Sequence, residues 1–393
     1  MSVPSPFDRR SVSPRPRGSL RPETALRDHP SLLRRLLRQL LFVPDPQIYW
    51  IPFAFAAARR ALGRRPADAI FCSGPPFSIF ILGRGLKSYW RAPLVLDYRD
   101  VWMDHPWWPV PRWRRPLERW LERRLLAGAD LVLANHNSMF QTLLARAPRI
   151  ADRCLVVPNG FDPDELGPPV SPAWRSGQKF EMVYAGTLYR AVAGPDAHSD
   201  ALSVQRPLGL FRALRRLYDR GVFGAGGVRV TFAGAKEGTD EDQNLRGCAR
   251  ECGVADLVEV LPRMEKSDVV PILRRAHLLL NILYYTEAQV AQKVYDYLHL
   301  EIPILSLFRG TEANASVVRR ARAGPIVDPA DSGAISSAIE TIVREYAAGR
   351  RPIASDRQFI DEFDARSQAR VLDSRLRALI AARRRSAGGH DGR

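Results

Sequence analysis

The sequence of 393 residues has little cysteine and no long hydrophobic run. Its four cysteines are too few and too scattered for a disulfide framework, and we expect reduced, buried thiols. The longest apolar stretch, 48–58, is far shorter than the roughly 20 residues that a membrane-spanning helix needs. The start of the chain has no apolar core of the signal-peptide type, which argues against ordinary secretion.

Lysine is scarce as well, although the chain is strongly basic. Only five of the 59 basic residues are lysines, so guanidinium groups carry nearly all of the net charge of +17. Such a surface favours phosphates, nucleic acid or anionic lipid. Because the arginines are dispersed and no recognition motif accompanies them, we do not expect nucleic acid as a partner.

Ten short apolar runs alternate with helix-like segments, which is typical of parallel sheets covered on both faces. With 46% apolar residues the chain is long enough for two cored domains. We therefore predict an α/β fold with two doubly wound domains. The runs are 70–72, 94–96, 131–133 and 155–157 in the first half, and 182–184, 228–232, 258–261, 278–282, 304–307 and 326–327 in the second.

Composition suggests where the domains begin and end. A cluster of prolines after residue 162 would interrupt any element there, and we place the linker at that point. The predicted division is a disordered arm (1–30), an N-terminal domain (31–162), a linker (163–178), a C-terminal domain (179–355), a C-terminal helix (356–385) and a tail (386–393).

The segment 32–41 has leucines at helical spacing and arginines on the other side. Two interpretations stay open for this basic amphipathic helix. It lies in the headgroup plane of an anionic membrane, or it packs on the first sheet.

A candidate anion site follows the strand expected at 182–184. Gly186 would let a ligand approach the backbone, while Arg206 and Lys293 each stand at a predicted helix start, where a cation could grip a diphosphate. Asp296 could accept sugar or ribose hydroxyls. The alternatives are an ordinary turn at Gly186, and an exposed Lys293–Asp296 ion pair worth about 0.2–0.5 kcal/mol.

The order of these motifs resembles a known family. Three motifs are similar, in this order, to the donor half of the retaining GT-B glycosyltransferases of group 1, which are family 4-like. They are GTLY at 186–189, Arg206 with Pro207, and KVYDYL at 293–298. A bacterial branch of that group has segments similar to 73–78, 96–102, 129–134 and 157–162. The resemblance covers roughly 32–379 and says nothing about the sugar.

The resemblance implies two facing Rossmann-like domains and a role for each matched residue. Gly186, Thr187 and Gly234 would bind the donor, with the first two facing its phosphates, and Arg206 and Lys293 would neutralise the diphosphate.

The family's E-x7-E motif is altered in this chain. Asp296 takes the place of its second glutamate, near the nucleotide ribose, with a side chain one methylene shorter. Ala288 takes the place of the first, with Glu287 adjacent as a substitute.

Two groups of polar residues in the first half are further candidates. Asp97, Arg99 and Asp100 follow a predicted strand, and either they fix the next loop as a buried cluster or they act in catalysis, with Asp100 as the catalytic candidate. His136 lacks metal-ligand spacing and is expected at the surface.

The first domain departs from the family, because no strand comparable to the family's first one precedes residue 70. The first sheet is therefore expected to lack its N-terminal strands. Either the sequence starts inside a longer gene product, or the domain has lost its first βαβ units.

These inferences predict a glycosyltransferase that moves a hexose from a nucleotide diphosphate sugar to a hydroxyl with retention. We expect no metal and no cofactor beyond the donor, a glycan or lipid-linked acceptor, and a role in lipid-linked glycan or exopolysaccharide synthesis. The location would be cytoplasmic and peripheral, at the inner face of the cell membrane. The alternatives are a non-catalytic nucleotide-sugar-binding relic and a nucleotide-sugar epimerase on the same fold.

Overall fold

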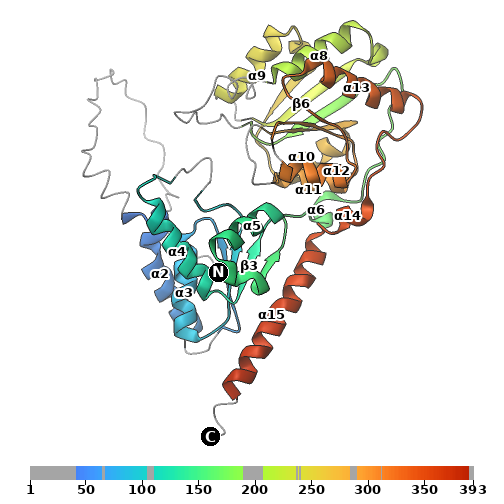
Figure 1. Ribbon diagram of the computed structural model, residues 1–393. Coiled ribbons are helices and arrows are strands. Elements are labelled where there is room, and N and C mark those ends of the chain that lie inside the picture. The colour runs from blue at the N-terminus through green and yellow to red at the C-terminus, as the bar shows by residue number, and fades with distance from the viewer. Residues whose placement is uncertain are drawn as a thin grey trace, which may run out of the picture.

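The computed structural model describes residues 41–63, 67–103, 110–188, 207–235, 238, 240–283, 290–310 and 312–388, without the side chains of 240, 241 and 386–388. The arm 1–30, all but the last residue of the 32–41 helix, Arg206 and Glu287 lie outside these residues. Within them the fold is α/β with two parallel sheets, as the sequence predicts (Figure 1).

The first sheet has four parallel strands in chain order, β1-β2-β3-β4. Leu94 and Leu96 pack on one face with residues of the helices between the strands, and Val95 points to the opposite face. The elements are η1 (Pro46–Trp50), α2 (Ile51–Leu62), β1 (Ile70–Gly74), α3 (Ser78–Trp90), β2 (Leu94–Tyr98), α4 (Arg115–Gly128), β3 (Leu131–Ala134), α5 (Asn137–Arg146), η2 (Pro148–Arg153) and β4 (Cys154–Val156). Among the described residues, β1 is an edge strand with no strand before it.

The second sheet has six parallel strands in the order β10-β9-β8-β5-β6-β7. This is the doubly wound order, which reverses between β5 and β8. Its elements are β5 (Phe180–Ala185), α8 (Leu208–Asp219), η3 (Gly224–Gly226), β6 (Val228–Ala235), α9 (Asp240–Glu251), η4 (Ala255–Leu257), β7 (Val258–Pro262), α10 (Lys266–Arg274), β8 (Leu278–Ile282), α11 (Gln292–Leu300), β9 (Ile304–Leu307), α12 (Glu312–Arg320), β10 (Ile326–Val327) and α13 (Ser332–Ala347). All ten predicted strands are confirmed.

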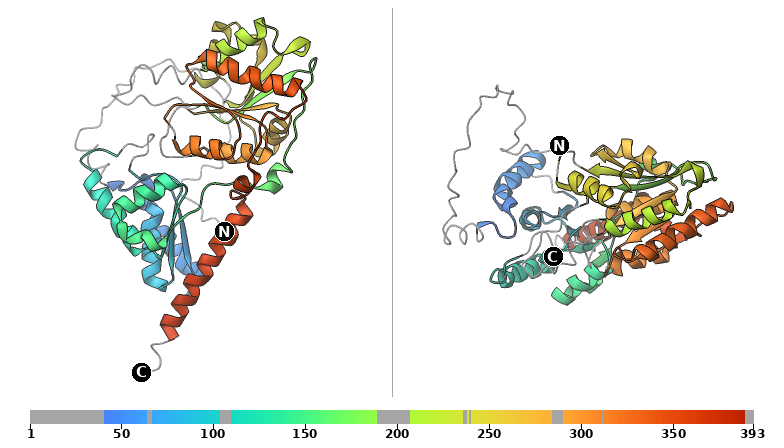
Figure 2. Two further views of the ribbon diagram at one scale, coloured as in Figure 1. Left: turned by 45° about the vertical axis from the view of Figure 1, so that its right-hand side comes forward. Right: turned by 90° about the horizontal axis from the view of Figure 1, so that it is seen from above.

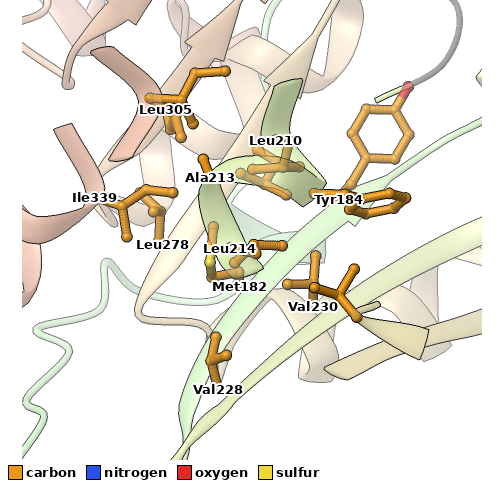
Figure 3. Close-up of a cluster of buried hydrophobic side chains, with 14 of the residues drawn as sticks. Met182, Tyr184, Leu210, Ala213, Leu214, Val228, Val230, Leu278, Leu305 and Ile339 are labelled. Carbon is orange, nitrogen blue, oxygen red and sulfur yellow. The ribbon is translucent and has the colours of Figure 1, made fainter. Parts of the chain in front are cut away.

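Both faces of the second sheet are buried. Met182 and Tyr184 of β5 pack with Leu210 and Leu214 of α8 and with Ile339 of α13 (Figure 3). The intervening residues of the strand turn the other way, into a core shared with α10, α11 and α12. Figure 2 shows the sheet between these two helical layers. Continuous apolar strands are what burial on both faces requires.

The linker contains an element that the sequence analysis excluded. Helix α6 (Pro163–Leu166) forms there because its proline occupies the first turn, where the missing N–H has no intrahelical partner to lose. The Asp162 carboxylate caps it by accepting a hydrogen bond from the N–H of Asp164.

The expected single C-terminal helix is two helices, α14 (Arg357–Asp361) and α15 (Ala365–Gly388). The chain breaks at Asp364, whose carboxylate accepts the N–H of Arg366 at 2.8 Å, as a capping residue does. Helix α15 then crosses to the first domain (Figure 1), where its leucines pack on the face of the first sheet that holds Val95. They are Leu372, Leu376 and Leu379.

The structure also bears on the cysteines and on membrane-spanning helices. All four cysteines are free thiols, and two of them, Cys72 and Cys248, are buried. Within the described part of the chain, every helix is too short or too polar to cross a membrane.

Candidate functional site

The carboxyl ends of β5 and β8 mark the place where the strand order reverses, and open α/β sheets bind ligands at such a place. Gly186 and Thr187 directly follow β5, and Gly234 lies near the end of the neighbouring β6. Lys293, at the start of α11, reaches the same edge, because its Nζ lies 3.6 Å from where a Cβ on Gly186 would stand. The fold therefore gathers four of the predicted donor residues at one edge.

Gly186 and Gly234 bring two backbones into contact. Their φ angles are 120° and 124°, a region that side chains rarely tolerate. The N–H of Gly186 donates to the carbonyl of Ala233 at 2.8 Å, and a bulge at Gly234 shifts the register of β6 against β7. A Cβ on Gly234 would meet the carbonyl of Gly186 at 3.0 Å.

Replacing Gly234 by alanine should therefore reduce the free energy of unfolding by about 1–3 kcal/mol and displace the loop at Gly186. Urea denaturation would measure the loss, and a nucleotide-binding assay would measure the displacement. The matched control is Gly221→Ala, at a φ of 66° with nothing within 4 Å of its Cβ. If the two variants bind nucleotide equally well, the close approach of the Gly186 and Gly234 backbones is not needed for binding.

Helix α11 is fixed to β5 by a buried tyrosine. The Tyr297 hydroxyl accepts the backbone N–H of Ala185 at 2.9 Å, which sets the first turn of α11 beside the end of β5. Lys293 then extends over the ring of Tyr184, with its Nζ 3.6 Å from the ring centroid. The Tyr184 hydroxyl donates to the carbonyl of Thr187 at 3.2 Å, so the same ring also holds the loop.

Lys293 is a buried amine beside an aromatic ring. No ion pair joins it to another residue of the described ranges, and the aromatic face of Tyr184 is its close neighbour. Burial lowers the pKa of Lys293 to about 7. An anion placed beside it would restore the charged form.

Asp296 does not pair with Lys293, so the alternative of an i,i+3 ion pair is not the arrangement found. Its carboxylate lies 3.3 Å from the Nζ of Lys266, which also contacts Glu165 at 2.7 Å. Burial raises the pKa of Asp296, and the charge of Lys266 opposes that rise. The two α11 side chains thus face different neighbours.

The carboxyl edge of the first sheet is tied together by Asp97 and Arg99. The buried Asp97 carboxylate accepts the Ser73 hydroxyl and the Nε of Arg99, each at 2.8 Å. The Arg99 guanidinium continues to the carbonyl of Val157 and the side chain of Asn159, at 3.4 and 3.3 Å. These contacts join the ends of β1, β2 and β4, as expected for a buried cluster that fixes a loop.

Asp100 and His136 stand at the ends of neighbouring strands. Asp100 is partly buried two residues after the end of β2, and its catalytic role stays a prediction. The expectation of a surface histidine is wrong, because His136 is only 7% exposed. Its Nδ1 accepts the N–H of Met139 at 3.0 Å and caps α5, a role that its position before a helix could have indicated.

A cavity of about 760 Å³ lies between the two domains, which the resemblance implied would face each other. His136 and Pro158 line it from the first domain, and Tyr295, Glu312 and Arg320 from the second. Burial raises the pKa of Tyr295, and the charge of Arg99 opposes the rise, so this charge reaches α11 from the other domain. No cluster of three or more metal-ligating side chains occurs within the described ranges.

A family model matches the first part of the chain. Residues 10–165 match the family model described as Glycosyltransferase Family 4. No curated protein matches the sequence.

Solved structures match most of the chain. Sucrose-phosphate synthase from Thermosynechococcus elongatus superposes with a TM-score of 0.60 at 15% identity, over 86% of this chain and 80% of that one. A glycosyltransferase from Rickettsia africae gives 0.57 at 11% identity, over 86% and 83%. HepE from Anabaena, in complex with UDP and glucose, gives 0.53 at 15% identity, over 84% and 81%. At such identities the likeness establishes the GT-B fold.

Proposed function

We propose that this protein is a retaining glycosyltransferase of group 1, of the bacterial branch, which transfers a hexose from a nucleotide diphosphate sugar to a hydroxyl. The observation that carries the proposal is Lys293, a cation with no counterion among the described residues, beside the glycine loop at the point where the strand order reverses. The match of the first part of the chain to a glycosyltransferase family supports it, as does the common fold with UDP-bound HepE.

In the proposed reaction the bond between the anomeric carbon and the diphosphate oxygen breaks. A bond from that carbon to the acceptor oxygen forms on the same face, and the proton of the acceptor hydroxyl passes to the departing diphosphate oxygen. Lys293, together with Arg206, neutralises the charge that grows on the departing diphosphate, which is the largest electrostatic change in the reaction. We assign the transfer no metal.

The other candidate residues are assigned roles in binding the donor or in catalysis. Gly186, Thr187 and Gly234 leave the phosphates access to the backbone, and Asp296 receives ribose hydroxyls beside Lys266. Glu287 is assigned to the donor, and Asp100 is assigned to catalysis from the first domain. The acceptor is a glycan or lipid-linked glycan, and the protein works at the cytoplasmic face of the cell membrane.

A thermal-shift panel tests the donor assignment. A ligand that binds only the folded protein stabilises it by about 2.7 kcal/mol at 100 times its Kd, which raises Tm by several degrees. We expect this shift with one nucleoside diphosphate and its sugar conjugate. The matching nucleoside monophosphate and the free sugar should give little shift, since neither offers the diphosphate to Lys293.

The panel and a transfer assay together separate the alternatives. No shift with any nucleoside diphosphate would contradict the proposal. Binding without transfer to any glycan or lipid-linked acceptor would assign the non-catalytic relic, and conversion of the nucleotide sugar without an acceptor would assign the epimerase. The anomeric configuration of the product, measured by NMR coupling constants, tests retention.

A further inference from the structure

Helix α4 exposes apolar residues to solvent. Trp113 in the turn before the helix, and Leu117 and Trp120 on it, are 46%, 41% and 53% exposed. They follow one another at helical spacing, so they form one stripe. The α4 outer face, as we call this surface, consists of Arg112, Trp113, Pro116, Leu117, Arg119, Trp120, Arg123, Arg124 and Ala127.

The acids of α4 are on its inner side. Glu118 and Glu122 are fully buried, which is rare for glutamate unless it is paired. Arg114 lies 2.6 Å from the Glu118 carboxylate, which also accepts the indole N–H of Trp102, and Arg146 binds both oxygens of Glu122 at 3.0 and 3.1 Å. The helix thus buries both of its acids beside Leu125 and Leu126 and leaves Trp120 exposed.

With both glutamates buried, the α4 outer face has positive charge only. Arg112, Arg119, Arg123 and Arg124 are exposed around the apolar stripe. A hollow of about 400 Å³ between α4 and α5 is lined by Arg115, Arg119, Arg123 and Arg146. It is large enough for a phosphate group, and Glu122, the one acid among the described residues that line it, is already paired.

We propose that the α4 outer face docks on an anionic phospholipid membrane. Tryptophan and leucine enter the headgroup boundary, and the surrounding arginines bind lipid phosphates, a combination typical of helices that lie in the membrane plane. The face is on the other side of the first sheet from α15, on the outside of the domain (Figure 1). This inference deepens the proposed membrane location and is independent of the transfer chemistry.

Sedimentation of the full chain with vesicles tests the proposal. We expect stronger binding to vesicles that contain phosphatidylglycerol than to phosphatidylcholine alone, and less binding as salt rises. Arg112→Gln with Arg119→Gln should lower the partition coefficient about 30-fold, or about fivefold for each basic residue near the surface. The same loss for the control pair Arg212→Gln and Arg250→Gln, which removes equal charge from α8 and α9, would overturn the proposal.

Tryptophan quenching by lipids with brominated acyl chains tests the depth of insertion. The wild-type protein should be quenched, and Trp113→Phe with Trp120→Phe should lose most of that quenching. Equal quenching of the two proteins would contradict docking through this face.

Two further variants distinguish the competing explanations. Lys293→Ala should bind vesicles like the wild type, so a failure of the transfer chemistry leaves this test intact. The second variant combines Arg34→Gln, Arg35→Gln and Arg38→Gln. If it no longer binds vesicles while the α4 variant still does, the N-terminal segment is the membrane contact and the proposal is wrong. The proposal is also wrong if the variant with Arg112→Gln and Arg119→Gln loses binding to single-stranded RNA but still binds vesicles like the wild type.

Discussion

Replacing Lys293 by alanine should lower turnover by about 100-fold or more, by analogy with the loss of one oxyanion donor. Lys293 has no counterion among the described residues, so its charge is available to the diphosphate. The interaction strengthens as negative charge builds during bond cleavage, and its loss should therefore appear mainly in kcat. Initial rates of nucleoside diphosphate release, with an acceptor found by the transfer assay, would measure it.

Two other replacements separate this role from a structural one. Lys293→Arg keeps a cation and should retain part of the turnover. Lys293→Met keeps a similar volume without charge, so it should lose turnover like alanine and yet raise Tm at pH 7, because it no longer buries an ammonium group. A variant without the cation that transfers sugar as fast as the wild type would disprove the catalytic role.

Nucleoside diphosphate affinity should fall steeply above pH 7, approaching tenfold for each pH unit. The lowered pKa of Lys293, about 7, is the cause, because the free protein loses the ammonium proton above that pH. The terminal phosphate, with a pKa of about 6, keeps its charge over this range. Binding at pH 8.5 should then take up about one proton, which calorimetry in buffers of different ionisation enthalpy would detect.

Lys293→Arg is the matched control for this pH dependence, because a guanidinium stays charged throughout. The variant should bind with nearly constant affinity between pH 7 and 9. A steep wild-type profile that persists in the arginine variant would assign the titration to another group. A flat wild-type profile would show that Lys293 keeps its proton in the free protein.

Local sequence was enough to place the strands. Each predicted run, from 70–72 to 326–327, is short, apolar and bounded by turn residues, and a parallel strand buried on both faces needs that pattern. The same local reasoning was wrong at Pro163 and Asp364. A proline can begin a helix as well as end one, and an aspartate can cap a second helix where a single one was expected.

The sequence also identified residues that the fold brings together. Gly186, Gly234 and Lys293 were selected by their order and by the resemblance, and the structure gathers them at one sheet edge. The sequence could not identify the neighbour of Lys293. The alternative interpretation paired it with the nearby Asp296, whereas the side chain lies over Tyr184, more than a hundred residues earlier.

By itself, the sequence determined the α/β class, the ten strands and most of the candidate anion site, because these depend on local apolar patterns and on motifs that follow strands. Only the tertiary structure decided whether each amphipathic helix face packs against a sheet, and which sheet, or stays exposed to solvent. A helix pattern tells which side is apolar but not which sheet covers it, so the packing of Leu372 and Leu376 on the first sheet could not be predicted. The exposure of Trp120 on α4 was decided in part in the same way, because Glu122 is held inward by a buried ion pair with Arg146 of α5, while Glu118 pairs locally with Arg114.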